Sequence, residues 1–201
     1  MANYKTTRVI PIALTLILIA IAIAALVSLA RFIFFSGGTG TTTSQADISK
    51  AALLDTFADR AVRMTVRGAI VADETFRSYQ IQITPNERRL TTYKGYQNQP
   101  INNISLGNNL PAYEQFVYAL NRINFMKSNE LTGDKNDLRG VCATGFLYEF
   151  QILKANESLK QLWTSSCSAS RGSLNIKLDP LTKLFIAQIP EAKSLIGKLW
   201  Q

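Results

Sequence analysis

The chain has 201 residues, with 22 lysines and arginines against 14 aspartates and glutamates, a formal net charge of +8, and no histidine. Without histidine, Ser-His-Asp and Cys-His catalytic arrangements are excluded, and two cysteines alone cannot complete a tetrahedral zinc site. Apart from Arg88-Arg89 the basic residues are scattered, whereas a nucleic-acid interface would cluster them. We therefore predict no nucleic-acid partner, no metal and no cofactor.

The run from residue 9 to residue 30 contains no charged side chain and is almost wholly Ile, Leu, Ala and Val. As a helix it would be about 33 Å long, enough to cross the hydrocarbon layer of a membrane. The preceding tail, residues 1–8, carries Lys5 and Arg8, and the positive-inside rule places such a tail in the cytoplasm. We predict a single-pass anchor over residues 9–35 in the cell membrane, with the rest of the chain extracytoplasmic. A cleaved secretory signal is the alternative.

Residues 36–46 follow the anchor and are mostly Gly, Ser and Thr, a composition typical of a flexible linker. Residues 47–201 are long enough to form one domain with its own hydrophobic core. A helix is predicted from Asp47, which can cap it. Alternating apolar and polar residues then predict strands over residues 62–70, 79–83 and 88–96. The Asn-rich stretch 97–110 is predicted to be a polar loop.

Pro111 suits the first turn of a second helix, whose apolar face would extend to residue 126. A polar loop over 127–140 precedes predicted strands at 146–153, 159–167 and 174–178. The C-terminal stretch is amphipathic, and Pro190 is expected to divide it into two helices. This order predicts an α+β fold with an antiparallel sheet of about six strands and helices on one face.

Cys142 and Cys167 both fall in the predicted extracytoplasmic part, where disulfides persist. They bracket two predicted strands and could meet at the open end of a hairpin. We predict a disulfide between them, with two buried thiols as the alternative. Closing this loop would stabilise the fold by about 3 kcal/mol in the chain-entropy model.

Aromatic side chains supply the candidate ligand groove, because such residues are enriched in binding sites. The residues proposed to line it are Tyr93, Tyr96, Tyr113, Tyr118 and Trp163, with Trp200 as a further candidate. The alternative is that they fill the core and cover sheet faces.

Two segments resemble known sequences: YKGYQNQPINNISLGNNLPAYEQFVYALNRINF and CATGFLYEFQILKANESLKQLWTSSC. They are similar to uncharacterised single-pass envelope proteins of ultrasmall candidate-phylum (Saccharibacteria-type) bacteria, over about residues 60–190. The resemblance implies an exported, disulfide-bearing domain. It assigns neither a reaction nor a functional residue.

These features favour a non-catalytic binding or assembly module of the cell envelope, with an envelope protein, a wall polymer or a lipid as its partner. The alternative is a hydrolase of wall or lipid substrates that uses carboxylates such as Asp134, Asp137 or Glu149, because paired carboxylates can perform acid–base chemistry without histidine. Two of them within about 5–10 Å in a cleft would favour the hydrolase.

Overall fold

The computed structural model describes residues 45–201, which form one unit with its own core. The predicted tail and anchor, residues 1–8 and 9–35, lie outside the described residues, as does nearly all of the linker 36–46. Within the described range, the helices are all too short or too polar to cross a bilayer.

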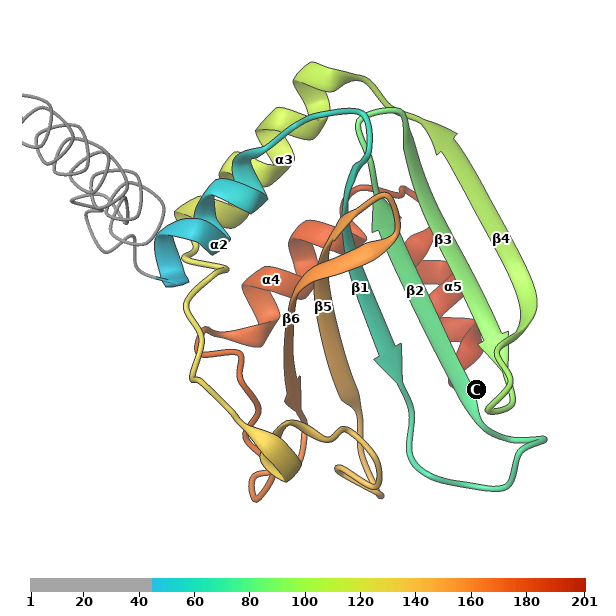
Figure 1. The fold of residues 1–201 in the computed structure, drawn as a ribbon. Helices are drawn as coiled ribbons and strands as arrows, with labels where there is room; N and C mark the ends of the chain where they lie inside the picture. The colour runs from blue at the N-terminus through green and yellow to red at the C-terminus, as the bar shows by residue number, and fades with distance from the viewer. Residues whose placement is uncertain (1–44) are drawn as a thin grey trace, which may run out of the picture. The chain divides into compact units, whose positions relative to one another are not determined.

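Six strands form a single antiparallel sheet in the order β4-β3-β2-β1-β5-β6 (Figure 1). They are β1 (Arg60–Arg67), β2 (Arg77–Ile83), β3 (Glu87–Lys94), β4 (Gln99–Gly107), β5 (Leu147–Lys154) and β6 (Glu157–Ser165). The helices are α2 (Gln45–Leu54), α3 (Leu110–Arg122), α4 (Leu178–Ile186) and α5 (Ala192–Leu199), with a short 3-10 turn, η1 (Gly133–Asn136). The prediction of an α+β fold with a six-stranded antiparallel sheet is therefore confirmed.

The core lies between the helices and one face of the sheet. Alternate residues of β1 point into it, namely Val62, Met64 and Val66, because successive side chains of a strand point to opposite faces. Their cross-strand neighbours on β2 and β5 are equally apolar. All four helices contribute to this core, with Leu53, Tyr113, Phe116, Val117, Leu120, Leu181, Phe185 and Ala192. We call this surface of the sheet the helix-covered face and the other the open face.

Strand β4 corrects the sequence analysis, which treated residues 97–110 as a loop. β4 is the edge strand beside β3, and five of its first six side chains are exposed. Ile104 and Leu106 are partly buried against the core, but the exposed first half of β4 lacks the alternation of buried apolar residues that marks the other strands. The connection from β3 uses Gly95 and Asn98 in the left-handed region, with φ of 69° and 54°.

The strand predicted at 174–178 is also wrong. Leu174 forms only an isolated bridge with Ser128, and Leu178 already begins α4. The next residues, Asp179 and Pro180, lie in the first turn of that helix, where proline is tolerated because its missing N–H needs no partner. Pro190 does separate two helices, α4 and α5, as predicted.

The disulfide prediction is confirmed, since Cys142 and Cys167 are bonded with their Cα atoms 5.4 Å apart. The bond lies at the open end of the β5–β6 hairpin, where Leu147 pairs with Ser165. At the other end, Ala155 and Asn156 both have positive φ, as a two-residue hairpin turn of type I′ requires.

Candidate functional site

The open face of the sheet is polar over most of its width. Neighbouring residues form two rows that cross all six strands. One row contains Gln161, Gln151, Arg63, Gln82, Arg89 and Ser105. The other contains Trp163, Glu149, Thr65, Gln80, Thr91 and Asn103. Amides, hydroxyls and ions therefore occupy the positions that apolar residues occupy on the helix-covered face.

A hollow of about 220 Å³ opens on this face above β1, β2 and β5. Its lining includes Arg63, Thr65, Gln80, Tyr93, Glu149 and Gln151. Some of the polar residues there are deeply buried although no helix of residues 45–201 covers them: Ser78 is 2% exposed and Glu149 8% as whole residues. We call this site the polar hollow.

Arg63 lines the hollow from strand β1, in the interior of the sheet, and is partly buried. Its Nε and Nη2 atoms donate to Oε1 of Gln82 at 3.0 and 2.8 Å. Desolvation by the surrounding protein lowers the pKa of the guanidinium, while Tyr93 and Glu149 act in the opposite direction. The acceptor that fixes this cation is therefore a neutral amide.

Arg67 and Glu149 form an ion pair at the neighbouring positions, with Nη2 and Oε2 3.4 Å apart. The side chain of Glu149 is 10% exposed and that of Arg67 45%, so the acid lies on the floor of the hollow and the base at its rim. The hollow thus holds two cations and one anion.

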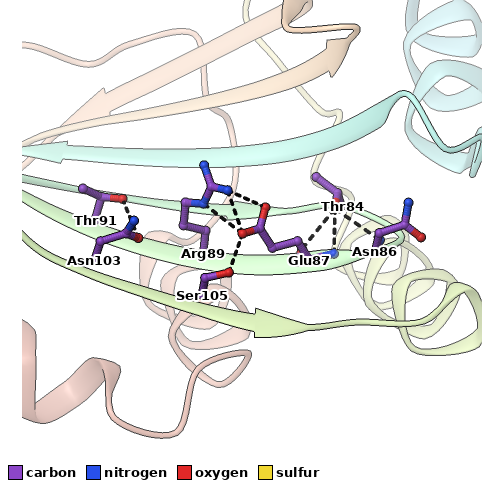
Figure 2. A network of polar contacts seen from close by, with 7 residues as sticks. All are labelled: Thr84, Asn86, Glu87, Arg89, Thr91, Asn103 and Ser105. Atoms are coloured by element: carbon purple, nitrogen blue, oxygen red, sulfur yellow. Dashed lines mark hydrogen bonds and ion pairs between the residues drawn. The ribbon is translucent and has the colours of Figure 1, made fainter.

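Towards the edge of the sheet, the open face continues as the network of Figure 2. The carboxylate of Glu87 accepts hydrogen bonds from Arg89 Nε at 3.0 Å and from Ser105 Oγ at 2.5 Å. These bonds, with Ser105 as the larger influence, lower the pKa of Glu87. Thr91 Oγ1 and Asn103 Oδ1 lie 3.4 Å apart on the same two strands.

At the opposite edge the open face becomes apolar, and the chain covers it. Trp163 on β6 is 3% exposed, and its Nε1 donates to Oδ1 of Asn136 in η1 at 2.9 Å. The backbone of Ser173 and Leu174 passes beside it, because Leu174 N donates to Trp163 O and Trp163 N donates to Ser173 Oγ. The polar hollow is therefore bordered on this side by a packed loop.

The aromatic residues predicted to line one groove lie in different surroundings. Tyr113 is in the core beneath the helices, and Tyr118 is exposed on α3. Tyr96 is stacked on Phe76, with its hydroxyl bonded to Val71. Trp163 lies under η1, and Trp200 packs against Phe146 and Tyr79. Only Tyr93 lines the polar hollow.

The three carboxylates considered for hydrolysis also have different settings. Asp134 is exposed in η1, and Asp137 follows it in the same loop. Hydrogen bonds from the Arg139 side chain and backbone lower the pKa of Asp137 to about 2, so it stays ionised near neutral pH. Glu149 alone lies in the polar hollow. Within residues 45–201 no three acidic or cysteine side chains are grouped as a metal site would need.

The sequence analysis placed Arg63, Thr65 and Arg67 at polar positions of the strand predicted over residues 62–70, but it did not connect them with a site. Gln80, Gln82 and Gln151 were not predicted to belong to a site. They alternate with the apolar residues of β2 and β5, and this alternation was used only to predict the two strands. The pairing register that brings these residues together cannot be predicted from the sequence of any one strand.

Comparison with known proteins assigns no family. No protein-family model matches the chain, and no curated protein sequence matches it either.

Proposed function

We propose that this protein is a membrane-anchored, extracytoplasmic binding module of the cell envelope, and that the open face of its sheet binds a wall polysaccharide. The observation that carries the proposal is the polar hollow, with the two polar rows that lead away from it across the sheet. Sugar hydroxyls both donate and accept hydrogen bonds, as do the amides and hydroxyls of this surface.

The chemistry of the face favours a polysaccharide over a protein or a lipid. The centres of protein interfaces are depleted in charged residues and enriched in aromatic ones, and a lipid surface would need an apolar area. The two rows instead present Arg63, Gln82 and Gln151 on one side and Thr65 and Gln80 on the other.

The size of the hollow supports a polymer. Pockets that enclose a small organic ligand usually measure about 300–1,000 Å³. The polar hollow measures about 220 Å³ and opens onto a polar surface. It suits one unit of a chain whose neighbouring units lie along the rows.

A binding role also fits the ionisable groups better than hydrolysis does. Glycoside hydrolysis ordinarily needs two carboxyl groups about 5–9.5 Å apart across the scissile bond. The lining of the hollow contains one, Glu149, which is paired with Arg67.

To test the proposal, the full-length protein is reconstituted in nanodiscs of uncharged lipid. Its binding to polysaccharide purified from the envelope of the producing cells is then measured. We expect saturable binding that falls about tenfold or more in the double variant Gln80→Ala/Gln151→Ala, because each lost hydrogen bond contributes about 1 kcal/mol. The matched control is Gln115→Ala, the same change at an exposed position of α3, which should bind like the wild type. Unchanged binding by the double variant, or capture of an envelope protein without any polysaccharide, would overturn the proposal.

The location is tested separately. Protease added to cells with opened outer layers should digest residues 47–201 and leave the segment 1–35 with the membrane. Complete protection of the domain in such cells would contradict the extracytoplasmic orientation.

A further inference from the structure

Arg63 differs from the other arginines of the open face. Strand alternation places three arginines there, and two of them face carboxylates: Arg67 is paired with Glu149, and Arg89 with Glu87. Arg63 is held by the neutral side chain of Gln82. Removing part of a cation's hydration without supplying an anion costs free energy, so this arrangement leaves a charge that a ligand could neutralise.

The orientation of the guanidinium defines what could bind. Gln82 occupies the edge formed by Nε and Nη2. No acceptor within residues 45–201 is bonded to Nη1, and this atom is not buried. The end of the guanidinium, with one N–H from Nη1 and one from Nη2, therefore remains available. That end can bind a carboxylate or phosphate through two parallel hydrogen bonds.

The surroundings extend this chemistry. Arg67 at the rim adds a second cation, which the single carboxylate of Glu149 balances, so the hollow keeps one excess positive charge. The other lining groups are neutral donors and acceptors, including Gln80, Gln151 and Tyr93. A ligand that satisfies both sets of groups carries an acid group on a hydroxyl-rich framework.

We infer that the polar hollow recognises an acidic polysaccharide, and that Arg63 binds the carboxylate or phosphodiester group of one of its units. This inference rests on the proposed function and specifies the class of ligand. Gln82 acts as a positioning residue, because its amide oxygen fixes the Nε edge and directs the free end of the guanidinium to the ligand.

The experiment compares three defined polymers of similar length with the full chain in nanodiscs of uncharged lipid. Oligogalacturonate carries carboxylates, poly(glycerol phosphate) carries phosphodiesters, and dextran is neutral. We expect at least one acidic polymer to bind tenfold or more tightly than dextran, and the polymer preferred identifies the acid group. The advantage should shrink as salt is raised from 0.01 to 0.15 M, because screening weakens charge pairs at a partly exposed site.

Variants of Arg63 then assign the effect. Arg63→Gln should reduce the affinity for the acidic polymer to that for dextran and leave dextran binding within about twofold. Arg63→Lys keeps the charge but not the paired N–H groups, and should retain an intermediate affinity. Arg122→Gln removes the same charge at an exposed position of α3, outside both polar rows, and should leave the affinity within about twofold. Thermal melting confirms that each variant is folded.

The outcomes separate this inference from the proposed function. Equal binding of dextran and both acidic polymers would overturn the inference and leave the proposed function standing. Tight acidic binding that survives Arg63→Gln in a folded protein would overturn the role of Arg63. Failure of all three polymers and of the envelope polysaccharide would overturn both.

Discussion

The helix-covered face and the open face are built from alternate residues of the same strands, yet they bury their side chains by different means. On β5, Phe150 points into the core and is fully buried, with Phe125 and Phe185 against its ring. Its neighbours Glu149 and Gln151 point the other way and line the polar hollow. On one face apolar surface is removed from water, which stabilises the fold. On the open face, neighbouring polar groups form hydrogen bonds and ion pairs with one another.

The two faces of each strand therefore have different roles, one in the stability of the fold and the other in presenting polar groups. Intramolecular hydrogen bonds contribute only about 0.5–1.5 kcal/mol each, because water competes for the same groups. The hydrogen-bonded pairs Arg63–Gln82 and Gln80–Thr65 therefore add little stability. They do hold donors and acceptors in fixed positions, which is what recognition of a polar ligand requires.

The comparison is tested most strongly by two substitutions on one strand. Phe150→Ala should lower the free energy of unfolding by about 3–5 kcal/mol, because it removes a fully buried ring and leaves a cavity. The adjacent change Gln151→Ala, on the open face, should lower it by less than about 1 kcal/mol. Urea unfolding in mild detergent measures both. Similar losses from the two variants would show that the open face also carries the stability of the fold.

A second prediction concerns the edge where the open face is covered. The variant Cys142→Ser/Cys167→Ser should lose about 3 kcal/mol, because the disulfide closes a loop with a sequence separation of 25. It should also loosen η1, which precedes Cys142 in the same loop and whose Asn136 is hydrogen-bonded to Trp163. In a Trp200→Phe background, we expect the emission of Trp163 to shift to the red. An unshifted emission together with full stability would show that packing alone holds this segment.

The smallest effect is expected in the network of Figure 2. Glu87→Gln should cost less than about 1 kcal/mol at pH 7, since the pair with Arg89 is partly exposed. Because the folded state lowers the pKa of Glu87 below its usual 4.5, this contribution is present above pH 4.5 and is lost as the pH falls through the folded value. Wild type and variant should thus converge in stability in acid. A difference that grows as the pH falls would contradict this assignment.

The sequence predicted the fold wherever one face of an element is apolar. Val62, Met64 and Val66 alternate with Arg63 and Thr65, and β1 was predicted from that pattern. The same reasoning located α3 and the division at Pro190. It missed β4, which pairs with β3 and whose first five residues are all exposed. It also took the single bridge at Leu174 for a strand.

The site was less predictable than the fold. Aromatic residues are informative only when their partners are known, and Tyr113 belongs to the core while Tyr93 belongs to the open face. The polar hollow combines residues from β1, β2, β3 and β5. Its composition depends on the register between strands that are distant in the sequence, and above all on the pairing of Arg63 with both Gln82 and Gln151.

The most direct test of the open face as a binding surface is hydroxyl-radical footprinting of the full-length protein in nanodiscs, with and without the envelope polysaccharide. Two tyrosines provide the comparison: Tyr93 lines the polar hollow, and Tyr118 is exposed on α3, which packs against the helix-covered face. Our account predicts that the polymer slows oxidation of Tyr93 several-fold and leaves Tyr118 unchanged. Protection of Tyr118 with no change at Tyr93, measured while the polymer is bound, would contradict it.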